Sequence, residues 1–79
     1  MVYTVITDVK QIVPGTILCE RFDTLRIYYI VTSIIISDNE YMGSLEYLFH
    51  DGDLTIMPLD FMPLGALVPS SLWKMVDMT

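Results

Sequence analysis

The strongest strand signal in this chain is the stretch RIYYIVTSIIIS at residues 26–37. Most of these residues are β-branched or aromatic, which is typical of a strand. Because both alternating faces of the stretch are apolar, we expect a central or strongly bent strand, with one face on the core and the other against a second sheet or a subunit. Residues 38–40 (Asp-Asn-Glu) then form a turn, and Gly43 permits a bulge or a sharp bend.

A tight hairpin is expected next, because Asp51-Gly52 is the pair favoured in type I′ turns and residues 44–50 and 53–59 flank it. A two-residue loop of this kind places His50 opposite Asp53. The alternation then divides the side chains between two faces. One face carries Leu45, Tyr47, Phe49, Leu54 and Ile56, and the other carries Glu46, Leu48, His50, Asp53, Thr55 and Met57.

The N-terminal third contains two further extended segments. Residues 2–7 are almost all β-branched or aromatic and predict a first strand, after which Asp8 caps a short turn over residues 9–11. Pro14-Gly15 suits a type II turn, since Pro fixes φ and Gly supplies a positive φ. The chain then continues extended over residues 16–22.

The C-terminal part is apolar but interrupted. Residues 61–69 contain two prolines and a glycine, so this segment either folds over an open barrel end or forms a contact surface. Residues 70–72 predict a single 3₁₀ turn before a last strand at 73–78. We therefore expect one all-β domain over residues 1–79, a small barrel or sandwich of five or six short antiparallel strands.

Among such folds, the chain resembles the SH3 family. The segment GALVPSSL at residues 65–72 is similar to the Gly, apolar, Pro, x, Asn, Tyr segment that forms the 3₁₀ turn before the final strand of SH3 domains. Together with Pro14-Gly15 and the tight hairpin, this resemblance implies an SH3-like barrel. The segment has one extra residue, and Ser71 and Leu72 replace the Asn and Tyr. Only Pro69 of the peptide groove carries over, so the resemblance implies the barrel and not binding of proline-rich peptides.

Acidic residues are concentrated in one part of the chain, which has a net charge of −6. No Lys or Arg occurs from residue 27 to 73, whereas the acids outside this stretch are balanced one for one by Lys10, Arg21, Arg26 and Lys74. This pattern disfavours direct binding of nucleic acid, because phosphate contacts need cationic side chains. The uncompensated acids are Asp38, Glu40, Glu46, Asp51, Asp53 and Asp60.

No arrangement of residues indicates catalysis, a metal site or a cofactor site. His50 is the single histidine, and we interpret it as part of an exposed cross-strand pair. Cys19 is the single cysteine and is interpreted as a buried core residue, which excludes an internal disulfide. Asp51-Gly52-Asp53 is better explained by a hairpin turn than by a calcium loop. The four glycines are isolated and form no phosphate loop. We therefore expect a protein that is not an enzyme.

The charge pattern favours a protein-binding module that docks its acidic surface on a basic partner. In composition the chain is similar to small acidic inhibitors encoded by phages and mobile elements, which implies a host nucleic-acid-binding protein as the target. The other interpretation of the acids is an ordinary solvated face that keeps an apolar protein soluble. With no signal peptide pattern and no apolar run of membrane-spanning length, we expect a soluble, cytoplasmic protein.

A different function is a structural or assembly subunit that forms homo-oligomers or packs into a larger phage complex. Apolar residues make up 53% of the chain and charged residues only 18%. So small a body is therefore expected to expose an apolar patch. The predicted contact surface lies in residues 61–69 and consists of Phe61, Met62, Leu64 and Leu67.

Overall fold

The computed structural model describes residues 1–52 and 59–78, and it confirms an all-β chain. The elements in order are β1 (Val2–Val5), the 3₁₀ segment η1 (Val9–Gln11), β2 (Ile17–Phe22), β3 (Leu25–Ser37), β4 (Glu40–Asp51), β5 (Phe61–Pro63), the 3₁₀ segment η2 (Leu64–Leu67) and β6 (Trp73–Asp77). No helix in these residues is long and apolar enough to cross a bilayer.

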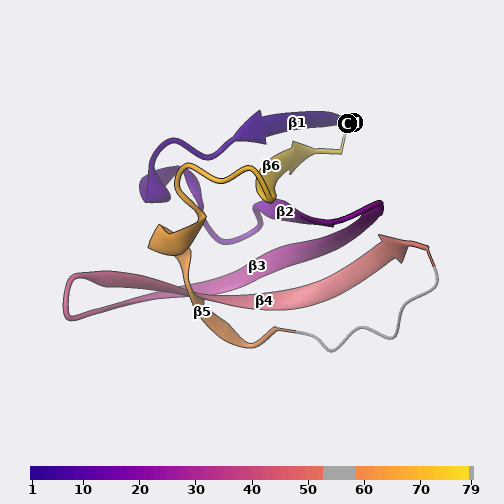
Figure 1. Cartoon of the computed structure of the whole chain (residues 1–79). Coiled ribbons are helices and arrows are strands. Elements are labelled where there is room, and N and C mark those ends of the chain that lie inside the picture. The colour runs from indigo at the N-terminus through magenta and orange to yellow at the C-terminus, as the bar shows by residue number, and fades with distance from the viewer. Residues whose placement is uncertain (53–58, 79) are drawn as a thin grey trace.

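All six strands belong to one antiparallel sheet with the order β1-β6-β2-β3-β4-β5 (Figure 1). The last strand, β6, returns to lie between the first two. Within the described residues no pairing joins the edge strands β1 and β5, so the sheet is not closed into a barrel.

Strands β3 and β4 form a long hairpin whose turn follows the sequence prediction. Asp38 and Asn39 have φ angles of 50° and 64°, which a type I′ turn requires at its two central positions. Asx residues tolerate this left-handed region better than other non-glycine residues. Pairing then extends from Ser37 opposite Glu40 to Arg26 opposite Asp51.

Two register shifts interrupt this hairpin and correct the predicted faces of β4. Tyr28 is opposite Phe49 and Tyr29 is opposite Tyr47, so Leu48 is an extra residue on β4. Because of this bulge, Tyr47 packs toward the main core with Tyr29, whereas Phe49 stacks on Tyr28 on the other face, with ring centroids 4.3 Å apart. The prediction that Tyr47 and Phe49 share a face is therefore wrong.

The second register shift also differs from prediction. Val31 is opposite Leu45 and Ser33 is opposite Ser44, which leaves Thr32 as the extra residue. The Thr32 hydroxyl donates a hydrogen bond of 3.1 Å to the Ser44 carbonyl. Gly43 was expected to permit a bulge, but it pairs regularly with Ile34.

The second strand of the predicted Asp51-Gly52 hairpin is residues 53–59, of which 53–58 lie outside the described residues. Gly52 has a φ of 113°, a conformation that favours glycine. Asp51 is the last residue of β4 and lacks the positive φ that a type I′ turn requires at both central positions, so the predicted type I′ turn at Asp51-Gly52 is wrong. The far end of the hairpin departs from the prediction, because Leu59 is not in a strand and Ser44 is opposite Phe61. A two-residue turn with unbroken pairing would have placed Ser44 opposite Leu59.

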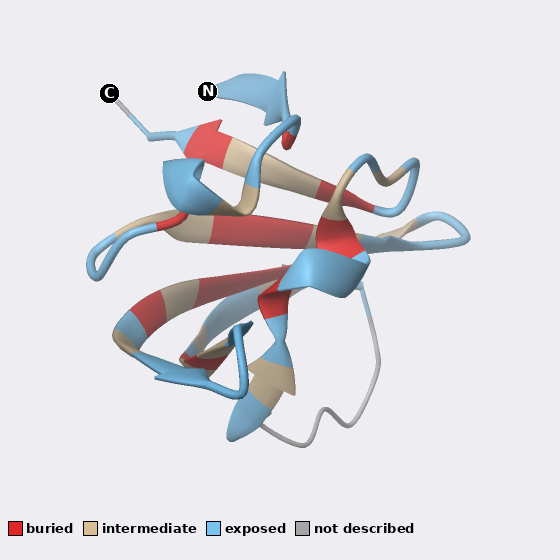
Figure 2. Ribbon diagram, turned by 90° about the vertical axis from the view of Figure 1, so that its left-hand side faces the viewer, coloured by how far each residue is buried: buried red, intermediate tan, exposed pale blue. Residues whose placement is uncertain are grey.

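The main core lies between the curved inner face of the sheet and the two 3₁₀ segments (Figure 2). It includes Ile6, Ile12, Leu18, Ile27, Tyr29, Val31, Leu45, Leu64, Leu67 and Trp73. A smaller cluster of Cys19, Tyr28 and Val76 lies on the opposite face, which we call the outer face. Residues on both faces of β3 are thus buried near its middle, but the expected second sheet is not present in the described residues, because all six strands belong to one sheet.

The N-terminal turns follow the sequence closely. Asp8 accepts a hydrogen bond from the Lys10 amide, and the Gln11 side chain accepts one from the Asp8 amide, which completes a capping box around η1. Gln11 also accepts a bond from the Thr7 amide, and β1 ends at Val5 rather than at the predicted residue 7. At the next turn Gly15 has a φ of 94°, and the Thr16 amide donates to the Val13 carbonyl.

The 3₁₀ turn before the last strand is present, but it lies at Leu64–Leu67 and not at residues 70–72. Residues three apart are aligned on a 3₁₀ helix, so this placement buries both Leu64 and Leu67. At the predicted position, the Ser70 hydroxyl oxygen instead accepts hydrogen bonds from the amides of Leu72 and Trp73. That side-chain turn brings the chain into β6 without a helical segment.

Candidate functional site

The distal part of the β3–β4 hairpin projects from the rest of the sheet. Strand β2 pairs with β3 only as far as Ile30, and β5 pairs with β4 only over Met42–Ser44. Residues 35–41 therefore form a two-stranded ribbon, which we call the hairpin tip and which extends to the left in Figure 1. The side chains of Ile35 and Ile36 on this tip are 50% and 61% exposed.

The five predicted acidic residues that the structure describes are exposed, but they do not form one compact patch. Asp38 is in the turn of the hairpin tip, and Glu40 is the first residue of β4. Glu46 and Asp51 lie farther along β4, and Asp60 just precedes β5, while Asp53 is outside the described residues. At ~3.3 Å per residue, the length of β4 places Glu40 and Asp51 roughly 35 Å apart. Of the described acids, Asp38 and Glu40 belong to the hairpin tip, which also carries the exposed Ile35 and Ile36.

The five described acids form no ion pair with a cationic side chain of residues 1–52 and 59–78. The ribbon formed by β3 and β4 therefore carries unpaired negative charge from the tip to Asp51. Negative potential along an exposed ribbon attracts cationic surfaces and repels anionic ones.

The predicted apolar contact surface needs a correction. Leu64 and Leu67 are 0% and 2% exposed, because η2 turns both side chains into the main core. Met62 is half-buried against the same core. Of the four predicted residues, Phe61 alone is an exposed large side chain, with 48% of its surface accessible.

His50 is not the exposed side chain that the sequence predicted. It is half-buried, and its Nδ1 lies 2.6 Å from the hydroxyl of Tyr47. The bulge at Leu48 brings these two side chains to the same side of the sheet. The expected partner Asp53 lies outside the described residues.

Cys19 is buried, as predicted, with 3% of its surface exposed. Desolvation raises the pKa of its thiol, because burial disfavours the charged thiolate, and a hydrogen bond with Tyr28 opposes this shift only in part. A raised pKa leaves the thiol protonated and poorly nucleophilic at neutral pH. Within the described part of the chain, no three His, Cys, Asp or Glu side chains are grouped in a way that could hold a metal ion.

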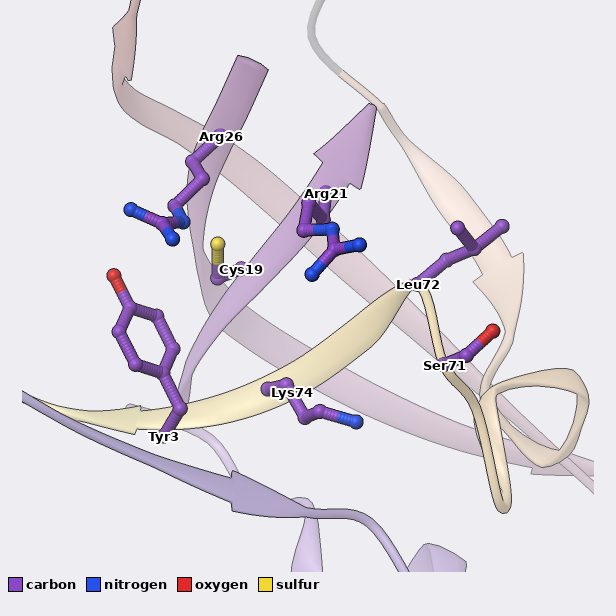
Figure 3. Close-up of a pocket in the computed structure, with 7 residues that line it drawn as sticks. All are labelled: Tyr3, Cys19, Arg21, Arg26, Ser71, Leu72 and Lys74. Atoms are coloured by element: carbon purple, nitrogen blue, oxygen red, sulfur yellow. The ribbon is translucent and has the colours of Figure 1, made fainter. Parts of the chain in front are cut away.

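The sequence analysis missed a pocket on the outer face of the sheet (Figure 3). Its volume is about 220 Å³, and its lining residues come from β1, β2, β3, β6 and the segment before β6. They are Tyr3, Cys19, Arg21, Arg26, Ser71, Leu72 and Lys74. Three of the four Lys and Arg residues of this acidic chain thus line a single pocket.

A signal for this cluster is present in the sequence. Asp23 and Thr24 form a two-residue loop between Phe22 and Leu25, and Asp23 has a φ of 59°. Such a loop places Arg21 directly opposite Arg26, and this is the register that the structure has. Because neighbouring acids balance these arginines in number, the charge pattern of the sequence does not indicate that the arginines lie together.

Comparison with known proteins gives no relative for this chain: no family model matches it, and neither does any curated protein or solved structure.

Proposed function

We propose that this protein is a non-enzymatic protein-binding module that docks the tip of its β3–β4 hairpin on a basic partner. The observation that carries the proposal is the composition of the tip. Two exposed isoleucines, Ile35 and Ile36, lie beside two carboxylates, Asp38 and Glu40, that have no ion-pair partner within residues 1–52 and 59–78.

The two kinds of side chain have complementary effects on binding. Apolar side chains that enter a pocket of the partner supply most of the affinity of an interface. Surrounding charges raise the association rate and select a partner of the opposite sign. A narrow projecting ribbon can also enter a concave site, such as a nucleic-acid channel, that a flat sheet face cannot reach.

The same reasoning supports two finer proposals. The position of η2 as the last element before the final strand, which returns beside β2, fits an open form of an SH3-like barrel. The acidic ribbon fits an inhibitor, of the kind that phages encode, that occupies the basic channel of a host nucleic-acid-binding protein. Net charge of −6 is consistent with such a target, because that channel normally attracts phosphates.

The chain offers a matched pair of variants to test docking by the tip. Ile36 and Phe22 are 61% and 63% exposed, and Asp38 and Asp23 both occupy hairpin turns with positive φ. The tip variant is I36S/D38N and the control is F22S/D23N. Each removes one exposed apolar side chain and one turn carboxylate, so the two variants differ only in location.

Tagged wild type and both variants are used to capture proteins from extracts of the native host at several salt concentrations. We expect wild type and the control to capture a basic protein that the tip variant binds at least about tenfold more weakly. This complex should dissociate as the salt concentration rises from about 50 mM to about 300 mM. Equal capture by wild type and the tip variant would refute docking through the tip.

A second function, assembly into homo-oligomers, is supported by the edge strand β1. All four of its residues are exposed, including Val2 and Val5 at 58% and 45%, and its outer edge has no neighbouring strand in the described sheet. Exposed apolar edge strands readily pair with another chain. Light scattering coupled to size-exclusion chromatography tests this function, since an oligomer that persists in high salt and dissociates on Val5→Lys substitution would favour assembly.

A further inference from the structure

We propose that the outer-face pocket of Figure 3 is a binding site for a small phosphate monoester, with Arg21, Arg26 and Lys74 as the groups that hold the phosphate. This site lies at the end of the β3–β4 hairpin opposite to the tip and is independent of docking by the tip.

Positive charge is concentrated in this pocket. The chain has four Lys and Arg residues against ten Asp and Glu residues, yet three of the four cations line this one pocket. They come from β2, β3 and β6, so the sheet brings together charges that are far apart in sequence. Convergent cations in a concave site focus a positive potential on its interior.

The opposed arginines of this pocket work against folding. Arg21 and Arg26 are directly opposite each other on paired strands, where like charges are destabilising. Asp51 is opposite Arg26 on its other side, but within the described residues no carboxylate forms an ion pair with either arginine. A like-charged pair with no ion-pair partner among the described residues is expected where an external anion is bound.

The cationic side chains of the pocket keep hydrogen-bond donors available for a ligand. The Arg26 guanidinium lies 5.6 Å from the centre of the Tyr3 ring, which restricts its orientation. Lys74 Nζ donates a hydrogen bond of 3.0 Å to the Ser70 carbonyl, which fixes the ammonium at the side of the pocket and leaves it two further donors. No hydrogen bond to a described residue occupies the guanidinium of Arg21 or Arg26. Planar guanidinium groups with free donors bind phosphate oxygens in pairs.

The size and walls of the pocket define the class of ligand. A volume of about 220 Å³ is below the roughly 300–1,000 Å³ typical of sites for drug-sized molecules. Leu72 and the ring of Tyr3 provide apolar walls, which suit a short organic group on the phosphate. A long polyanion is disfavoured, because beyond the pocket it would meet a protein of net charge −6.

Phenyl phosphate is a suitable probe, with benzyl alcohol as the uncharged control ligand. Titration is followed by amide chemical shifts in a ¹⁵N-labelled protein, for wild type, R21Q, R26Q and the control variant K10Q, whose cation is outside the pocket. We expect saturable shifts at residues of β2, β3 and β6 in wild type and K10Q. Affinity should fall at least about tenfold in R21Q and R26Q.

A peptide that contains phosphotyrosine and a single-stranded oligonucleotide complete the set of probes. If the peptide binds more tightly than phenyl phosphate, the natural ligand is a phosphorylated protein. If the peptide binds more weakly, the natural ligand is a free small molecule. Tighter binding of the oligonucleotide overturns the proposal, as does the absence of saturable binding by phenyl phosphate.

Stability without ligand provides a test that does not depend on the probe. R21Q removes the repulsion between opposed arginines, so we expect this variant to unfold at the same or a higher urea concentration than wild type. A lower midpoint would show that Arg21 stabilises the sheet itself, and this result would contradict the repulsion that we infer between the opposed arginines.

Discussion

Gly43 and Leu64 are in direct contact: a Cβ atom built on Gly43 would lie 2.7 Å from Cδ2 of Leu64. Leu64 is fully buried, and it opens the 3₁₀ segment η2 that covers the main core. The missing side chain at Gly43 therefore allows η2 to approach β4, and this contact positions the cap over the inner face of the sheet.

Gly43→Ala should destabilise the fold by about 1–3 kcal/mol, because the added methyl group displaces a buried leucine. Gly65→Ala is the matched control, since it is exposed and a Cβ there would meet nothing within 4 Å. It should change the free energy of unfolding by less than about 1 kcal/mol. Urea denaturation measures both. Equal midpoints for the two variants would contradict a tight contact between β4 and η2.

The relationship between Gly43 and Leu64 also illustrates what could not be predicted from the sequence. Turns that depend on one or two residues, such as the capping box at Asp8 and the left-handed turn at Asp38-Asn39, were predictable because their causes are local. The sequence indicates that Gly43 has a structural role, as a bulge or a sharp bend. It does not indicate which distant side chain occupies the space of the absent Cβ, because that depends on the fold of the whole chain.

Bulges limited the prediction of the sites in a similar way. Alternation assigns faces only while the register is unbroken, and the extra residue Leu48 moves Phe49 and His50 to the faces opposite to those expected. The acids were correctly predicted to be exposed where the structure describes them, but their proximity in sequence did not translate into a compact patch. The basic pocket depends on strand order, because Lys74 reaches Cys19 only when β6 returns beside β2.

Asn39→Gly should stabilise the protein by about 0.5–1 kcal/mol. Asn39 has a φ of 64°, which glycine adopts without the steric cost that a Cβ imposes, and Asn-Gly-type pairs favour this turn. Asn39→Val should have the opposite effect, since a β-branched residue disfavours positive φ. The urea midpoint should be highest with glycine at position 39, intermediate with asparagine and lowest with valine. A different order would argue against a type I′ conformation at the hairpin tip.

The fold should lose stability at alkaline pH through its buried tyrosines. Burial raises the pKa of Tyr29 to about 12 and also raises that of Tyr28, so both rings stay neutral in the folded state when the unfolded chain begins to ionise near 10. The unfolded state then binds fewer protons, and stability falls as the pH rises from about 10 to about 12.

Tyr29→Phe isolates this effect, because no hydrogen bond of the Tyr29 hydroxyl to a described residue would be lost. Thermal unfolding between about pH 8 and about pH 11 should show a shallower decline for the variant than for wild type. Parallel declines would assign the alkaline loss of stability to other groups.

Glu20→Gln should stabilise the protein at neutral pH and not in acid. Glu20 is a half-buried carboxyl on β2, opposite the buried residues Ile27 and Trp73 on the neighbouring strands. Desolvation raises its pKa above the ordinary value of 4.5, so the folded state holds the proton more strongly than the unfolded state does. The stability that Glu20 contributes is therefore complete below about pH 4.5 and is lost as the pH rises through the folded pKa.

Glutamine stays neutral, so the variant avoids this loss of stability at neutral pH. Its gain in the free energy of unfolding at pH ~7 should be less than about 1 kcal/mol, because solvent screens a half-exposed group. The gain should disappear near pH ~3.5, where Glu20 is protonated in both states. Glu46→Gln, at an exposed position of β4, is the control for removal of one negative charge. Urea denaturation at both pH values measures the difference, and an equal gain at both would show that burial of the charge is not its cause.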